Sequence, residues 1–138
     1  TDLAPLAEHK DIVLNCSGGA LIIGSDTLLY RLVFNLVENA IRYSRPGSTV
    51  NVSICDNDSH VFLRVEDQGP GIPKQYRESI FQPFFRLDKS RSRAYGGAGL
   101  GLALVWEIAA LHGGTVEVEA SSENGATMLT TLPKRTAA

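Results

Sequence analysis

Alternating apolar and polar positions mark four strands in the chain. Valine and isoleucine alternate with asparagine and serine over Thr49–Cys55, and the alternation resumes over Val61–Val65 after an Asp- and Asn-rich turn. A period of two puts every second side chain on one face, so both segments are expected to be half-buried antiparallel strands. Thr115–Ala120 and Ala126–Leu132 predict a final hairpin around Asn124-Gly125.

A helical period replaces this alternation over Asp26–Tyr43, the longest helix expected. Ser25 or Asp26 can cap its start. Its end is expected at Ser44-Arg45-Pro46-Gly47, because proline cannot donate to the helical ladder.

The remaining elements are shorter. Two short strands are expected around Ser17-Gly18-Gly19, at Ile12–Cys16 and Ala20–Ile23, a short helix near Lys74–Ile80, and a helix over Leu100–His112. Residues 1–10 are interpreted as the end of a preceding helix or a linker, residues 11–134 as one domain, and residues 135–138 as a tail. Because strands and helices alternate without a regular βαβ rhythm, we expect an α+β fold with a mixed, mainly antiparallel sheet and helices on one face.

Composition narrows the class of protein. The chain has 138 residues, of which 43% are hydrophobic and 20% charged, which excludes a disordered chain. A net charge of −2 argues against a broadly basic nucleic-acid binder. Cys16 and Cys55 lack the spacing of a zinc site or disulfide framework, so we expect both to be buried small hydrophobes in a reducing cytosol.

Asparagines stand out on the long helix. At about 100° per residue, Asn39 falls inside the apolar stripe, whereas Asn35 and Arg42 fall at its edge. A carboxamide among leucines costs about 1–3 kcal/mol unless its hydrogen bonds are met. Asn39 therefore needs either a protein partner or a ligand, and the helix alone does not decide between them.

Two glycine-rich segments extend the candidate site. Asp67-Gln68-Gly69-Pro70-Gly71 follows a strand directly, outside the expected core, and is either an ordinary turn or a place of close backbone approach. Residues 96–101 open a helix, where unpaired N–H groups suit phosphate. A basic run from Arg86 to Arg93 precedes them and is either a solvated loop or a cationic lid over a polyphosphate. Neither a P-loop nor a dinucleotide-binding fingerprint is present.

Together these segments resemble the four boxes of sensor histidine kinases. Residues 35–44 resemble the N box, 67–72 the G1 box, 81–86 the F box and 97–102 the G2 box, in the family's order. The resemblance covers the chain from about Ile12 to Pro133 and implies the catalytic ATP-binding domain of the GHKL superfamily. The implied architecture is a two-layer α/β sandwich, the Bergerat ATP-binding fold, with a flexible ATP lid.

The resemblance also implies roles for single residues. Asp67 would accept the adenine amino hydrogen, Gly69 and Gly71 would leave space for the purine, and Asn39, supported by Asn35, would hold Mg²⁺. Arg42 would contact phosphate and Tyr43 the nucleotide. Arg86 would reach the γ-phosphate during transfer, with Asn35 as the other catalytic candidate. The remaining implied nucleotide-binding residues are Ile72, Phe84, Gly97, Gly99, Leu100, Gly101 and Leu102.

Three further kinds of residue can be interpreted without a role in catalysis. Glu38 lies either on a solvated face or beside a substrate imidazole whose proton it helps to remove, and Trp106 belongs either to the core or to a packing surface. None of the three histidines, His9, His60 and His112, lies in a segment resembling the family's phosphoacceptor box.

The resemblance implies a histidine kinase that transfers the γ-phosphoryl group of ATP to a histidine on a separate dimerisation domain. The partners would be that domain and a response regulator receiver domain, with no nucleic acid. The isolated domain would be a cytoplasmic monomer, and its parent a membrane-anchored homodimer. The alternatives are a GHKL-type ATPase and a degenerate ATP-binding scaffold. The ATPase needs a water-activating glutamate four residues before the metal asparagine, where this chain has Asn35.

Overall fold

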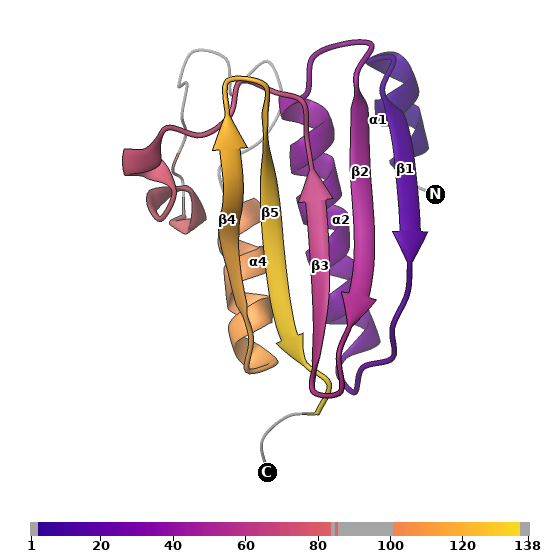
Figure 1. The fold of residues 1–138 in the computed structure, drawn as a ribbon, viewed down its shortest axis with the longest axis vertical. Coiled ribbons are helices and arrows are strands. Elements are labelled where there is room, and N and C mark those ends of the chain that lie inside the picture. The colour runs from indigo at the N-terminus through magenta and orange to yellow at the C-terminus, as the bar shows by residue number, and fades with distance from the viewer. Residues whose placement is uncertain (1–2, 84, 86–100, 136–138) are drawn as a thin grey trace.

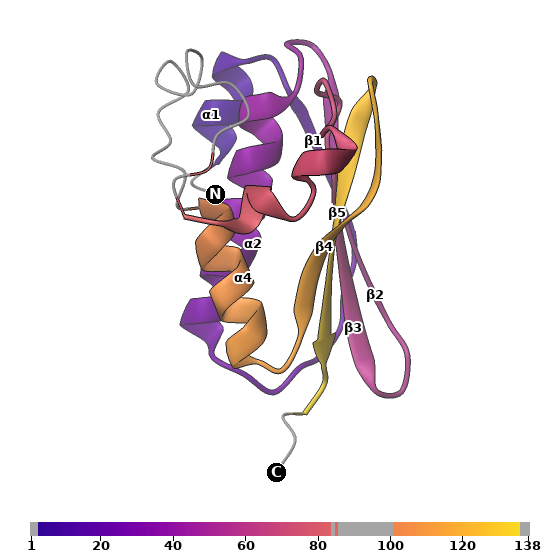
Figure 2. The same ribbon diagram turned by 90° about the vertical axis from the view of Figure 1, so that its left-hand side faces the viewer.

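The computed structural model describes residues 3–83, 85 and 101–135, which form two layers (Figures 1 and 2). The strands are β1 (Val13–Gly18), β2 (Thr49–Asp56), β3 (His60–Glu66), β4 (Thr115–Ser122) and β5 (Gly125–Pro133). The helices are α1 (Ala4–His9), α2 (Asp26–Tyr43), α4 (Gly101–Leu111) and the 3-10 turns η1 (Lys74–Tyr76) and η2 (Ser79–Phe81). None of the described helices is long and apolar enough to span a bilayer.

The strands form one sheet in the order β1-β2-β3-β5-β4. β1 runs parallel to β2, with Val13 opposite Thr49, and the other neighbours are antiparallel. The helices all lie on one face of this sheet (Figure 2). The expected mixed, mainly antiparallel sheet and two-layer α+β sandwich are therefore confirmed.

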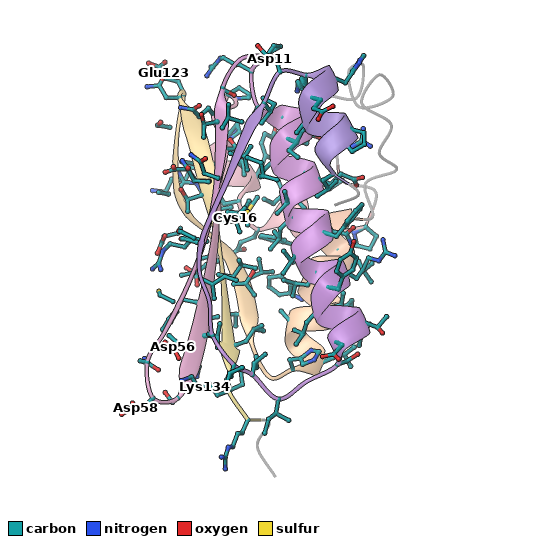
Figure 3. All side chains as sticks on the ribbon, turned by 90° about the vertical axis from the view of Figure 1, so that its right-hand side faces the viewer. Asp11, Cys16, Asp56, Asp58, Glu123 and Lys134 are labelled. Atoms are coloured by element: carbon teal, nitrogen blue, oxygen red, sulfur yellow. The ribbon has the colours of Figure 1, made fainter. Side chains whose placement is uncertain are left out.

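The core lies between the sheet and its helices. Alternate residues of β2 and β3 face α2, and the predicted stripe of α2 supplies Leu32 and Leu36, each 1% exposed. Ile41 is also wholly buried, in the same cluster as Leu3 and Ala7 of the N-terminal segment. Figures 2 and 3 show α1 beside the C-terminal half of α2, which explains why this flank is covered.

Both ends of α2 match the sequence expectation. The Ser25 hydroxyl accepts a hydrogen bond from the Leu28 N–H at 3.2 Å, and Ser44 ends the helix in an extended conformation. The Ser25 N–H donates to His112 Nε2 at 3.1 Å, and His112 Nδ1 lies 2.8 Å from the Ile108 carbonyl. A buried histidine at the end of α4 thus joins the start of α2 to α4.

Several expectations about the chain before α2 and about burial were wrong. Residues 20–23 form no strand, and β1 instead continues to Gly18. Gly18 has a positive φ of +81° and no Cβ, which allows it to lie against the Ile54 carbonyl. Cys16 and Cys55 are both exposed. Cys16 lies on the edge strand β1, labelled in Figure 3, where a side chain has a neighbour strand on one side only.

Two smaller differences concern helical segments. The short helix expected near Lys74–Ile80 is the pair of 3-10 turns η1 and η2. Trp106 is 48% exposed, and its ring centroid lies 5.4 Å from that of Phe81. It therefore belongs to a packing surface and not to the core.

Candidate functional site

Asp67 follows β3 directly and is held by the last hairpin. One carboxylate oxygen, Oδ1, accepts hydrogen bonds from the N–H groups of Gly69 at 3.0 Å and Ala126 at 3.1 Å. The Asp67 N–H donates to the Ala126 carbonyl at 2.9 Å. Among the described residues no donor is hydrogen-bonded to the second oxygen, Oδ2. The two backbone donors therefore orient the carboxylate and leave one oxygen for a ligand.

Burial sets the electrostatics of this carboxylate. Asp67 is 8% exposed and is therefore buried, although it lies outside the hydrophobic core cluster, as expected. Loss of water raises the pKa of Asp67, an effect that its two backbone hydrogen bonds oppose and the neighbouring charge of Glu66 reinforces. A buried carboxylate with a raised pKa and one oxygen unused is a candidate binding group for a ligand.

The segment after Asp67 is tied to the end of α2. The Gln68 N–H donates to the Ser44 hydroxyl at 3.1 Å, and the Gln68 side-chain oxygen accepts from the Thr49 N–H at 2.6 Å. The Arg45 guanidinium donates to the carbonyls of Gln68 at 3.1 Å and Glu123 at 2.9 Å. α2, β2 and the β4–β5 hairpin therefore hold this loop in one place.

The two glycines of the loop lie against other parts of the backbone. A Cβ at Gly69 would stand 2.2 Å from the Tyr43 carbonyl oxygen, and a Cβ at Gly71, whose φ is +81°, would stand 1.9 Å from the Ser122 carbonyl oxygen. Ile72 is half-buried, and its N–H donates to the Ser121 hydroxyl at 2.7 Å. These close approaches require glycine even without a ligand, and a role in making room for a purine stays a prediction.

Both asparagines lie in the second half of α2, whose last residue, Tyr43, is beside Gly69 of the Asp67 loop. Asn35 is 9% exposed and Asn39 is half-buried, whereas the helical pattern predicted that Asn39 would be the more buried of the two. Figure 2 shows α4 beside the N-terminal part of α2 and α1 beside its C-terminal half, so the burial of each side chain depends on which helix lies alongside its turn. Among the described residues no protein group is hydrogen-bonded to either side-chain amide.

Charged and aromatic groups continue along the last turns of α2. The guanidinium of Arg42 lies 3.6 Å from the Glu38 carboxylate, an (i, i+4) ion pair. Glu38 is thus partly exposed and paired, in keeping with the plainer of its two alternatives. Tyr43 is half-buried, and its carbonyl lies against Gly69.

The donor set suits a hard cation that is shared with a ligand. Amide oxygens are ligands of Mg²⁺, which is usually held by one or two protein oxygens together with substrate phosphates. Asn35 and Asn39 offer such oxygens without a competing protein partner in the described part of the chain. The described part of the chain contains no group of three His, Cys, Asp or Glu side chains that could hold a metal ion without a ligand.

The glycine-rich and F-box candidates are only partly described. Phe84, Arg86, Gly97, Gly99 and Leu100 lie outside the described residues, as does the predicted lid. Gly101 begins α4 with open space where a Cβ would stand, and Leu102 is half-buried against the core. No crowding from the described residues accounts for glycine at position 101.

Sequence reasoning missed the residues that support the site. Ser44, Gln68 and Arg45 orient the Asp67 loop through contacts between segments at least 19 residues apart. Lys10 was also missed, although it reaches the last turn of α2. Ser44 and Gln68 lie in segments that resemble the N and G1 boxes, but the sequence does not show these contacts, because they form only when the elements pack.

Comparison with known proteins gives consistent matches. Residues 24–136 match the family described as "Histidine kinase-, DNA gyrase B-, and HSP90-like ATPase". The chain is 45% identical over 129 residues to the "Sensor-like histidine kinase SenX3" of Mycobacterium tuberculosis, covering 92% of this chain and 32% of that protein. It therefore spans about a third of the length of this curated relative.

Solved structures agree with the fold. The "Mycobacterial sensor histidine kinase MprB" superposes with a TM-score of 0.81 and 34% identity, covering 98% of this chain and 91% of the other. Full-length ShkA in complex with AMPPNP superposes with a TM-score of 0.83 and 30% identity, covering 99% of this chain and 28% of the other.

Proposed function

Because this chain belongs to the histidine kinase-, DNA gyrase B- and HSP90-like ATPase family and is the catalytic ATP-binding domain of a sensor histidine kinase, we propose a specific activity. The chain binds Mg²⁺–ATP at the end of the sheet where the Asp67 loop meets the last turns of α2. It then transfers the γ-phosphoryl group to a histidine on the dimerisation domain of its parent. The observation that carries this proposal is the orientation of Asp67, which leaves Oδ2 as a fixed acceptor.

Adenine recognition follows from that acceptor. The 6-amino group of adenine donates a hydrogen bond, whereas guanine carries a carbonyl there and would place oxygen against oxygen. A site with a buried, hydrogen-bonding group strongly rejects an analogue that leaves the group unpaired. Asp67 therefore selects ATP over GTP in this proposal.

The triphosphate would lie toward α2. Asn39, supported by Asn35, would contribute amide oxygens to Mg²⁺, which neutralises the phosphate charge when bound. Arg42 would contact phosphate, and Tyr43 the nucleotide. From its motif, Arg86 would reach the γ-phosphate, together with the backbone of Gly97, Gly99 and Gly101.

The chemical step needs positioning more than acid or base chemistry. The unprotonated nitrogen of a neutral substrate imidazole forms a bond to the γ-phosphorus while the bond between that phosphorus and the bridging oxygen of ADP breaks. ADP leaves with the electron pair, and the ring keeps its other N–H proton as an imidazolium. Charge neutralisation by cationic side chains and the metal lowers this barrier. The receiver domain of a response regulator would then accept the phosphoryl group. We place the domain on the cytoplasmic side of a membrane-anchored parent.

The residue at position 35 distinguishes a histidine kinase from an ATPase that hydrolyses ATP. Asn35 lies one helical turn before Asn39 and carries an amide, which cannot take a proton from water. The chain should therefore hydrolyse ATP slowly, unlike the ATPases of its family. A degenerate scaffold is disfavoured because Asp67, Asn35 and Asn39 are all present.

Radiolabelled ATP tests the proposal directly. The chain with Mg²⁺ should bind ATP, should not label itself, and should give an acid-labile product only when the dimerisation domain of its parent is supplied, weakly because no tether raises the effective concentration. An Arg86→Ala variant should lose transfer far more than ATP affinity. Rapid phosphate release by the chain alone, or label on His9, His60 or His112, would contradict the kinase activity.

A further inference from the structure

The last turn of α2 has carbonyl groups that the helix itself cannot pair. The final four C=O groups of a helix lack intrahelical donors, and here they belong to residues 40–43. The Ser44 N–H donates to the Ala40 carbonyl at 3.0 Å. The Tyr43 carbonyl lies in the close approach to Gly69. The carbonyls of Ile41 and Arg42 are left, and both accept from the ammonium group of Lys10, at 3.2 Å for Ile41.

The turn after α1 delivers Lys10 to this position. α1 ends in a Schellman motif, in which the Ile12 N–H donates to the Ala7 carbonyl at 2.8 Å and the Asp11 N–H to the Glu8 carbonyl at 3.1 Å. Asp11 takes the left-handed position, with φ of +59°. Ile12 and Ala7 are both buried in the core cluster, as the motif's apolar contact requires.

The same turn is bonded to the loop that leaves α2. The Gly47 N–H donates to the Asp11 carbonyl at 3.0 Å, and the Val13 N–H donates to the Ser48 carbonyl at 3.0 Å. The loop that follows α2 and the turn that carries Lys10 therefore form one bonded unit, at the end of the molecule where Figure 3 labels Asp11.

From this geometry, and resting on the proposed function, we propose that Lys10 is a positioning residue for ATP. Its ammonium group holds the last turn of α2, and thereby sets Arg42 and Tyr43 where they meet the nucleotide. A cation at a helix C-terminus also offsets the partial negative charge there. Partial burial, and secondarily the charge of Arg42, lower the pKa of Lys10, as expected for an ammonium group partly shielded from water beside a second cation.

The proposal predicts a difference between ligands as well as a loss of stability. In a Lys10→Met variant the alkyl stem remains, but the carbonyls of Ile41 and Arg42 lose their donor. The last turn should then loosen, and ATP affinity should fall about tenfold, the equivalent of one such charged hydrogen bond. Adenosine, which lacks the phosphates and depends chiefly on Asp67, should lose much less. Lys10→Arg, which keeps cationic donors, should recover most of the ATP affinity.

Lys134→Met is the matched control. Lys134 is also a partly exposed lysine, and its ammonium group pairs with the Asp56 carboxylate at 2.6 Å. Figure 3 shows this pair at the opposite end of the sheet from Asp11. Its loss should lower the melting temperature slightly and leave the affinity for both ligands unchanged.

Calorimetric titration with ATP and adenosine, far below the melting temperature, separates the outcomes. Equal losses for ATP and adenosine in Lys10→Met, or no loss for either, would show that Lys10 only stabilises the fold and would overturn the proposal. Failure of the unaltered chain to bind ATP would instead overturn the proposed function.

Discussion

At the scale of single residues, Asp67 shows how the fold divides one side chain between structure and recognition. Oδ1 serves the backbone of Gly69 and Ala126, and Oδ2 is left for the ligand. Alanine would remove both functions at once, because it leaves two buried N–H groups without an acceptor. Asparagine separates them, because its carbonyl oxygen can keep the backbone bonds while its NH₂ group takes the place of Oδ2.

Asp67→Asn should therefore change nucleotide preference without unfolding the chain. The amide would present a donor to the 6-amino group of adenine, and ATP affinity should fall about ten- to hundredfold for the loss of a charged hydrogen bond. Inosine triphosphate, whose 6-oxo group accepts, should bind this variant better than it binds the unaltered chain. Competition titrations with both nucleotides measure the change, and ATP binding at full strength by the variant would refute the role of Oδ2.

The raised pKa of Asp67 also predicts a pH dependence of stability. A carboxyl group whose pKa is higher in the folded chain than in the unfolded chain binds its proton first in the folded chain. Its contribution to the free energy of unfolding is therefore full below the ordinary aspartate pKa and is lost as the pH rises through the raised value. Urea unfolding across mildly acidic pH should show this term in the unaltered chain and lack it in Asp67→Asn. Parallel profiles for the two would contradict the shift.

At the scale of elements, contacts between segment ends decide where the site lies. Gly69 shows this, because a Cβ there would meet the Tyr43 carbonyl at 2.2 Å, whereas nothing lies within 4 Å of a Cβ at Gly19. Gly69→Ala should cost about 1–3 kcal/mol of stability and weaken ATP binding, since the loop must move away from α2. Gly19→Ala should change neither. Denaturant titration and calorimetry of the two variants give the comparison, and equal behaviour would show that the contact is dispensable.

The start of α2 offers a second test among elements. Ser25→Ala removes the hydroxyl that accepts from the Leu28 N–H and should cost about 1 kcal/mol. The exposed neighbour Thr27 takes no such part, so Thr27→Ala should be neutral or slightly stabilising. Urea midpoints measure both, and a neutral Ser25→Ala would mean that the bond from the Ser25 N–H to His112 alone suffices at this end.

The elements that sequence predicts well are those decided by local chemistry. The bounds of α2 follow from the Ser25 cap and the Pro46 stop, and the two hairpins follow from alternation. The exposure of Cys16 could not be predicted in this way, because alternation does not tell an edge strand from a central one. Neither could the greater burial of Asn35 over Asn39, which depends on which helix lies alongside α2. The motifs named the Asp67 loop, but its ties to Ser44, Arg45 and Ala126 appear only in the folded chain.

At the scale of the whole molecule, nucleotide binding should be visible as stability. A ligand that binds only the folded chain adds about 2.7 kcal/mol at a hundred times its dissociation constant. For a domain of this size that corresponds to a rise of roughly 10 °C in the melting temperature. ATP with Mg²⁺ should produce the rise, GTP should not, and the Asp67→Asn variant with ATP should show a much smaller rise. Equal stabilisation by ATP and GTP would exclude selection through the 6-amino group.

The pairing of β3 with β5 has a consequence for folding during synthesis. These strands pair residue by residue from His60 with Pro133 to Glu66 with Thr127, although they are separated by about half the chain. During synthesis, β3 therefore stays without its second neighbour until residues 125–133 have left the ribosome. The Ala126 N–H that orients Asp67 arrives with the same segment. A nascent chain halted before that point should have α2 and its asparagines but no formed adenine site, so the ability to recognise ATP is acquired only once residues 125–133 are available to pair with β3.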